Sequence, residues 1–166
     1  VGTTQNVLAA FAHAPPSSAA SRTPRVWLQA SAIGFYGVRE PAELLTETSA
    51  AGTGFMSELC RQWEAAALPA VASGARQVVL RLGVVWGQGG ALPPLLMPIR
   101  LGMGGRLGSG DQIVSWIHLH DVLRLIARAL ATPAMQGTYN AVAPGALSQA
   151  AFVATAAQVL HRPNWL

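Results

Sequence analysis

The chain has 166 residues, of which 51% are hydrophobic and 11% are charged, with a formal net charge of +4. This composition excludes a disordered chain or a coiled coil, and the single cysteine excludes an internal disulfide and a cysteine-based metal cage. All eleven basic residues are arginines, which excludes a lysine Schiff base and a P-loop lysine.

Hydrophobic periodicity and turn residues predict the elements of the first half. A helix is expected over residues 3–13 and a short buried strand over residues 25–30. The apolar spacing of residues 54–73 predicts a second long helix, with Thr53 as its N-cap. Because proline cannot continue a helix undisturbed, Pro69 is expected to kink or divide it.

The second half begins with a β-branched run over residues 76–85, which is typical of one continuous central strand buried on both faces. A short helix over 91–101, a glycine-rich loop over 102–110 and a short strand over 113–117 follow. This alternation of helices and strands predicts an α/β fold with a mainly parallel sheet, in one domain spanning residues 1–166. The remaining expected elements are a helix over 122–130 capped by Asp121, a strand over 137–142 and a helix over 149–160 capped by Ser148.

Several short motifs follow the predicted strands in a fixed order. They are SAIGFYG at 31–37, RLGVVWG at 81–87, GRLGSGDQ at 105–112, WIHLHD at 116–121 and YNAVAP at 139–144. In this order they resemble the second half of the extended short-chain dehydrogenases/reductases, from about residue 5 to residue 163. Residues 55–64 and 115–118 are most similar to an atypical subgroup, the NAD-dependent epimerase/dehydratase-like proteins.

The resemblance implies a partial Rossmann-like, doubly wound fold, with NADP or NAD as cofactor and a small molecule as substrate. The implied activity is that of an NAD(P)-dependent oxidoreductase or epimerase-like protein. Family members begin with a half that carries the glycine-rich cofactor loop, and no G-x-G-x-x-G motif follows a strand in this sequence. The resemblance therefore implies that the sequence is a central and C-terminal fragment, which alone is expected to be inactive.

Active members use a tyrosine, with a lysine four residues later, to transfer a proton. Phe55 and Leu59 stand at these positions here, and neither side chain can move a proton. Ser31 and Tyr36 are therefore the candidate catalytic residues. The strand-end serine of the family falls on Ser31 when the Ser-Ala pair is aligned and on Ala32 when the Tyr-Gly pair is aligned. The alternative for Ser31 is a structural serine that ends the strand by hydrogen-bonding to the backbone. The alternative for Tyr36 is a tyrosine whose ring is packed and whose hydroxyl faces solvent.

The resemblance also suggests residues that face the ligands. Arg106 in the glycine loop and Asn140 near a strand end are the candidate substrate contacts, and a solvated arginine and a bond to loop backbone are their alternatives. Val114 and Ser115 stand where nucleotide-sugar enzymes carry an arginine, which argues against a nucleotide-diphosphate sugar. The candidate cofactor-binding residues are Ala30, Ser31, Ala32, Gly83, Val84, Val85 and Trp86.

A pair of histidines, His118 and His120, has no third ligand at useful spacing, so no metal site is expected. His118 is expected instead to hold a strand-to-helix turn. The loss of the tyrosine–lysine pair leaves a second function open, a non-catalytic protein that senses a dinucleotide or binds a partner on the same scaffold.

Partners and location are expected as follows. The arginines are scattered along the sequence, whereas the basic residues of a nucleic-acid-binding surface are clustered. No nucleic-acid partner is therefore expected. No apolar run is long enough to cross a bilayer, and the expected location is the cytoplasm. By resemblance, a homodimer forms through the helices at 3–13 and 54–73.

Overall fold

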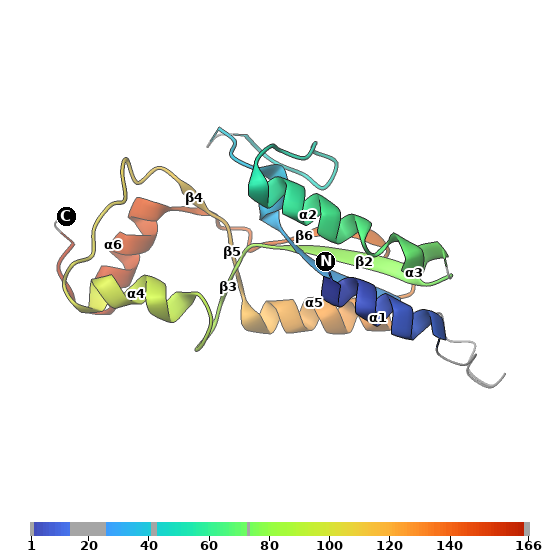
Figure 1. Cartoon of the computed structure of the whole chain (residues 1–166). Coiled ribbons are helices and arrows are strands. Elements are labelled where there is room, and N and C mark those ends of the chain that lie inside the picture. The colour runs from blue at the N-terminus through green and yellow to red at the C-terminus, as the bar shows by residue number, and fades with distance from the viewer. Residues whose placement is uncertain (1, 14–25, 41–42, 73, 165–166) are drawn as a thin grey trace. The chain divides into compact units, whose positions relative to one another are not determined.

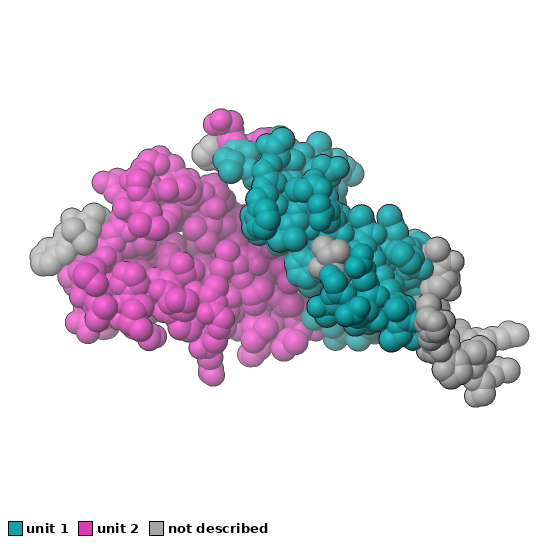
Figure 2. Space-filling view, viewed as in Figure 1, with its two compact units in different colours: residues 1–39, 44–81, 124–140 teal, residues 40–43, 82–123, 141–166 magenta. Residues whose placement is uncertain are grey.

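The computed structural model describes residues 2–13, 26–40, 43–72 and 74–164 (Figure 1). It divides into two compact units, which Figure 2 shows in two colours. Unit 1 comprises residues 1–39, 44–81 and 124–140, and unit 2 comprises residues 40–43, 82–123 and 141–166. The chain enters each unit more than once, so neither is a continuous stretch of sequence. The proline- and serine-containing segment from Pro15 to Pro24, which the sequence predicts as a polar linker, lies outside the described residues.

Unit 1 contains a three-stranded sheet in the order β1-β2-β6, formed by β1 (Val26–Ala32), β2 (Arg76–Leu82) and β6 (Gly137–Ala141). The consecutive residues 78–81 of the central strand β2 are all buried. Because successive side chains of a strand point to opposite faces, both faces of β2 are covered. This confirms the burial predicted from the β-branched run.

Helices accompany this sheet. They are α1 (Gly2–His13), α2 (Phe55–Ala65), α3 (Leu68–Ala72) and the later part of α5 (Leu119–Ala131). In Figure 1, α2 and α5 lie on opposite sides of β2. Arg76 Nη2 of β2 donates to the carbonyl oxygen of Ala129 in α5 at 2.7 Å. The sheet of unit 1 is thus layered between helices, as an α/β fold requires.

The predicted helix over 54–73 is divided between α2 and α3, just before Pro69, as expected. The prediction of Thr53 as N-cap is wrong. Gly54 occupies the N-cap with φ +93° and no side-chain cap. That backbone conformation favours glycine over threonine, so the helix starts one residue later.

Unit 2 contains two short strand pairs. β3 (Val84–Trp86) pairs in parallel with β5 (Trp116–His118), and β4 (Ile113–Val114) pairs in antiparallel with β7 (Leu147–Ser148). Together with the sheet and helices of unit 1, these elements confirm the predicted α/β fold class, with parallel pairing between strands far apart in sequence.

The predictions of a continuous strand over 76–85 and of one strand over 113–117 are wrong. The first breaks at Gly83, whose N–H donates to the carbonyl oxygen of Ala141 at 3.1 Å. The second breaks at Ser115, whose carbonyl oxygen accepts the N–H of Val84 at 2.9 Å. A Cβ at position 83 would lie 2.8 Å from that same oxygen of Ser115. The glycine therefore permits a close backbone approach that ends both strands.

Helices α4 (Leu92–Arg100) and α6 (Gln149–Val159) pack around a small apolar core of Ile99, Val153 and Ala157. The Ser148 hydroxyl accepts the N–H of Ala151 at 3.1 Å, which confirms Ser148 as the cap of α6. Among the residues described, no helix is both long and apolar enough to cross a bilayer.

The start of α5 corrects a further prediction. Asp121 lies inside the first turn of α5, which begins at Leu119, so it is not the N-cap. The ring of His118 takes this role, because its Nδ1 accepts the N–H of His120 at 3.2 Å. The expectation that His118 holds the strand-to-helix turn is therefore confirmed.

Candidate functional site

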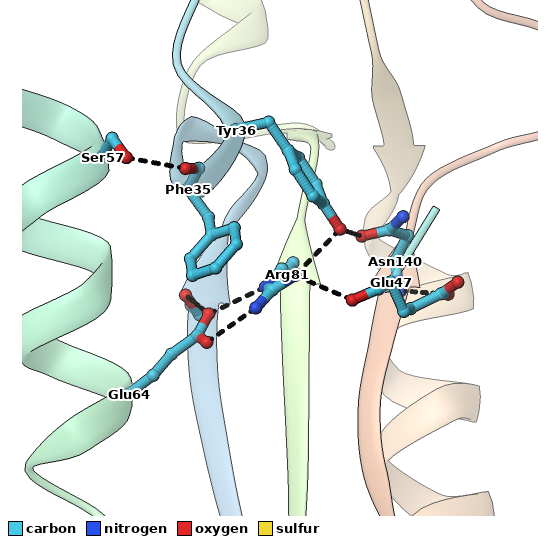
Figure 3. Close-up of polar contacts among 8 residues, drawn as sticks. Phe35, Tyr36, Glu47, Ser57, Glu64, Arg81 and Asn140 are labelled. Atoms are coloured by element: carbon cyan, nitrogen blue, oxygen red, sulfur yellow. Dashed lines mark hydrogen bonds and ion pairs between the residues drawn. The ribbon is translucent and has the colours of Figure 1, made fainter. Parts of the chain in front are cut away.

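Three polar residues occupy the same position on three neighbouring strands of unit 1. Ser31, Arg81 and Asn140 are each the penultimate residue of β1, β2 and β6. Hydrogen bonds through Glu64 and Tyr36 link all three (Figure 3). Because the same ends of the strands are joined, the strands run parallel and their carboxyl ends share one edge. Ligands of open α/β sheets bind at such an edge.

The centre of this edge is an ion pair between Arg81 and Glu64, whose side chains are 6% and 15% exposed. The guanidinium binds the carboxylate with two nitrogens, Nε to Oε1 and Nη2 to Oε2, both at 2.9 Å. The Ser31 hydroxyl donates to Glu64 Oε1 at 2.7 Å. The guanidinium carbon lies 3.4 Å from the ring centroid of Phe35. These contacts fix the arginine in one orientation.

Two opposing effects act on the charge of Arg81. Burial lowers the pKa of its guanidinium, but hydrogen bonds to Glu64 and Tyr36 raise it, and the net shift is upward. Arg81 is therefore a permanent cation at the carboxyl edge of the sheet.

The Tyr36 side chain is 3% exposed and uses its hydroxyl twice. The hydroxyl donates to Asn140 Oδ1 at 2.7 Å and accepts from Arg81 Nη1 at 3.0 Å. The alternative of a hydroxyl that faces water is therefore not what the structure shows. The tyrosine connects the ends of β2 and β6 with the short 3-10 helix η1 (Ile33–Tyr36) that follows β1.

A loop segment is anchored to this edge by Asn140. The main-chain N–H of Asn140 donates to Glu47 Oε1 at 2.8 Å, and its Nδ2 donates to the Leu45 carbonyl oxygen at 3.4 Å. The pKa of the Glu47 carboxyl is lowered first by the hydrogen bond from the N–H of Asn140 and next by the hydrogen bond from its own N–H. Burial raises this pKa, and the charge of Arg81 lowers it, but the net shift is downward. The contact with Leu45 is the bond to loop backbone that the sequence left open as an alternative.

The far end of this loop packs on α2 and η1. The Ser57 hydroxyl lies 2.8 Å from the carbonyl oxygen of Phe35 (Figure 3). It lies at the same distance from the carbonyl oxygen of Gly52, and its one proton can be donated to one of the two at a time. A Cβ at Gly52 would lie 2.1 Å from the carbonyl oxygen of Tyr36. Only a residue without a side chain fits there, so the loop closes directly against the backbone beside Tyr36.

The other predicted site residues fall into two groups. Ala30, which is exposed, and Ala32, which is half-buried, flank Ser31 in unit 1. The predicted cofactor segment Gly83 to Trp86 belongs to unit 2, where Trp86 stacks on Trp116 with ring centroids 4.4 Å apart and planes at 9°. Arg106 is exposed, also in unit 2. The cofactor and substrate roles of these residues stay predictions.

The two positions at which the family resemblance expects the catalytic tyrosine and lysine lie on α2. Phe55 is 79% exposed and Leu59 is half-buried. Leu59 lies one residue before Cys60, which is fully packed. Neither side chain takes part in the polar contacts at the strand ends.

Sequence reasoning missed Glu64, Arg81 and Glu47 as members of the site. Arg81 carried a usable signal, since an arginine inside a buried β-branched run needs a carboxylate partner. Nothing in the sequence identified which of the seven acidic residues would supply it. Glu47, in a loop without periodicity, gave no signal at all.

No family model matches the chain. The epimerase family protein SDR39U1 homolog, chloroplastic, of Arabidopsis thaliana is 38% identical over 151 residues, which cover 90% of this chain and 43% of that protein. The epimerase family protein SDR39U1 of Bos taurus is 38% identical over 167 residues, which cover 99% of this chain and 54% of that protein. The chain thus spans about half the length of the curated relatives it matches.

Among solved structures, the chain is similar to human epimerase family protein SDR39U1 (isoform 2), crystallised with NADPH. The two share 36% sequence identity with a TM-score of 0.84, over 97% of this chain and 52% of that one. This agreement confirms the predicted Rossmann-like fold.

Proposed function

We propose that the chain forms the nicotinamide- and substrate-side portion of one NAD(P)-binding domain. The proposal is supported by its homology to epimerase family proteins, which are atypical extended short-chain dehydrogenases/reductases and of which it spans about half the length. The proposed activity is that of an NAD(P)-dependent oxidoreductase or epimerase-like protein acting on a small molecule. The observation that carries this proposal is the shared carboxyl edge at Ser31, Arg81 and Asn140. It is where a parallel α/β sheet binds its ligand.

The cofactor supplies hydride transfer when bound, and each unit, considered by itself, contains a candidate segment for holding it. In unit 1, Ala30, Ser31 and Ala32 end the first strand. In unit 2, the indole N–H of Trp86 is buried and lacks a hydrogen-bond partner among the described residues. A buried donor without an acceptor costs free energy, which fits a segment that faces a bound group.

The chain's own residues have distinct tasks in this proposal. Arg81, fixed by Glu64, is a positioning residue that holds the Tyr36 hydroxyl at 3.0 Å. Tyr36 and Ser31 are the candidates that contact substrate, because Phe55 and Leu59 cannot transfer a proton. Asn140 orients the Tyr36 hydroxyl, because its Oδ1 accepts the hydrogen bond that this hydroxyl donates.

One observation favours the second candidate function, a non-catalytic protein that senses a dinucleotide or binds a partner. The proton of the Ser31 hydroxyl is engaged by Glu64, and the Tyr36 hydroxyl both donates and accepts within the protein. A substrate oxygen would have to displace one of these partners. In a binding protein the same contacts need not change.

The test is a titration of NADPH and NADH into the protein that contains this chain, followed by turnover on a panel of carbonyl compounds. The oxidoreductase proposal expects saturable binding and turnover that Tyr36→Phe or Ser31→Ala lowers at least about tenfold, the scale of a lost general acid–base group or oriented donor. Saturable binding without turnover, unaffected by both substitutions, supports the non-catalytic alternative. Binding of neither nucleotide contradicts the oxidoreductase proposal and the dinucleotide sensor, and supports only the partner-binding form of the alternative.

We also propose that the protein forms a homodimer through α1 and the α2–α3 region. Apolar side chains of these helices are exposed in the isolated chain, among them Val7 at 52%, Leu68 at 59% and Val71 at 42%. Sedimentation equilibrium tests this proposal. A dimer that Val7→Glu converts to monomer supports it, and a monomer at all concentrations contradicts it.

A further inference from the structure

A cavity of about 320 Å³ opens within unit 2. This volume falls within the range of small-molecule sites. One wall is apolar and comes from the first turns of α4, while the polar side chains come from its last residue, from β5 and from the turn after β3. The lining residues are Gly87, Gln88, Leu92, Pro93, Leu96, Arg100 and His118.

The polar side chains that line the cavity are Gln88, Arg100 and His118, and no carboxylate is among its lining residues. Arg100 is a permanent cation with donors only. His118 Nδ1 already accepts the N–H of His120 at 3.2 Å. A His118 ring that accepts this hydrogen bond carries its proton on Nε2, so that Nε2 is a hydrogen-bond donor.

The charge of Arg100 is not balanced by a neighbour. In the part of the chain that the structure describes, Arg100 makes no ion pair, in contrast to Arg81. The acidic residues of unit 2 are Glu40, Glu43, Asp111 and Asp121, and none of them lines the cavity. A cation at the end of an apolar wall complements an apolar molecule that carries one anionic group.

We propose that this cavity binds a small apolar carboxylate, with its carboxylate at Arg100 and His118 and its hydrocarbon part against Leu92 and Leu96. The inference goes beyond the proposed function, because it assigns a ligand class to a cavity of unit 2, whereas Ser31 and Tyr36 belong to unit 1. A nucleotide-diphosphate sugar would bring two phosphates and several hydroxyls to a wall that offers mainly carbon and a single arginine. The arginine missing at Val114 and Ser115 agrees with this exclusion.

Isothermal titration calorimetry on the protein that contains this chain tests the proposal with octanoate and its neutral analogue octanamide. We expect octanamide to bind about tenfold more weakly, because charge-assisted hydrogen bonds are about twice as strong as neutral ones. Arg100→Gln is expected to weaken octanoate about tenfold and to leave octanamide unchanged. Arg162→Gln, which removes an exposed arginine of the same unit outside the cavity, is the matched control and should change neither.

A second variant keeps the test independent of folding defects. In His118→Asn the side-chain oxygen replaces the Nδ1 acceptor that caps α5, while the Nε2 donor is lost. We expect the circular dichroism spectrum to be unchanged and octanoate binding to weaken several-fold. Equal binding of octanoate and octanamide, or unchanged octanoate binding by Arg100→Gln, would overturn the proposal.

Two further measurements separate the possible failures. Tighter binding of octyl phosphate than of octanoate would overturn the assignment to a carboxylate. Titration of NADPH into the protein that contains this chain is run in parallel. Intact NADPH binding without octanoate binding overturns this inference alone, whereas octanoate binding without any nucleotide binding overturns the proposed function.

Discussion

The two units use their arginines in opposite ways. In unit 1, Arg81 is buried and its guanidinium is bound by Glu64, Tyr36 and the ring of Phe35. In unit 2, Arg100 is exposed, has no acidic partner among the described residues and borders a cavity. The first arrangement organises the protein's own strand ends, whereas the second leaves donors available to a ligand. The difference separates an arginine that holds strand ends together from an arginine whose donors are not used by an acidic side chain among the described residues.

The largest expected effect comes from comparing the two arginines directly. Arg81→Ala leaves the Glu64 carboxylate without its buried partner and should lower the free energy of unfolding by about 3–5 kcal/mol. Arg100→Ala should change it by no more than about 0.5 kcal/mol, as for most surface substitutions. Urea denaturation followed by circular dichroism measures both. Equal effects of the two substitutions would remove the distinction drawn between the units.

A smaller effect is expected from the tyrosine that links the strand ends. Tyr36→Phe removes the donor to Asn140 Oδ1 and the acceptor for Arg81, and should lower the free energy of unfolding by about 1–2 kcal/mol. Tyr139→Phe is the matched control, since its hydroxyl makes one exposed bond to the Gln136 carbonyl oxygen at 3.2 Å. If the two variants unfold at the same urea concentration, the hydroxyl of Tyr36 contributes nothing beyond an ordinary surface bond.

The smallest effect concerns the loop carboxylate. The pKa of Glu47 lies below its usual value of 4.5, so the ionised form stabilises the folded chain at neutral pH. This contribution is complete above the usual pKa and is lost as the pH falls through the lowered one. Glu47→Gln should therefore be slightly less stable than the parent at about pH 7 and equal to it in strong acid. Urea midpoints at both pH values measure this, and a difference that persists in acid would exclude a role for the charge.

Much of the fold follows from local sequence signals. The buried run of β2, the division of the helix before Pro69 and the Ser148 cap each depend on residues close together in the chain. The breaks at Gly83 and Ser115 depend instead on a backbone contact between segments thirty residues apart. A β-branched run predicts a strand but does not reveal where another segment will approach it.

The site was predictable to a lesser degree. Ser31, Tyr36 and Asn140 stand next to strand ends, which motif order and turn residues locate, and the structure joins them within unit 1. The pairing of Arg81 with Glu64 connects a strand and a helix, and it depends on how α2 packs over β1. Such a choice of partner is set by tertiary packing, and the spacing of residues in one sequence does not contain it.

The single thiol of the chain belongs to α2, where Cys60 is 1% exposed and its sulfur lies close to Gly34 of η1. A maleimide or iodoacetamide reagent can reach this sulfur only after α2 separates from η1. Since no other cysteine competes for the reagent, the rate of covalent labelling reports how often the helix that carries Glu64 separates from its neighbours.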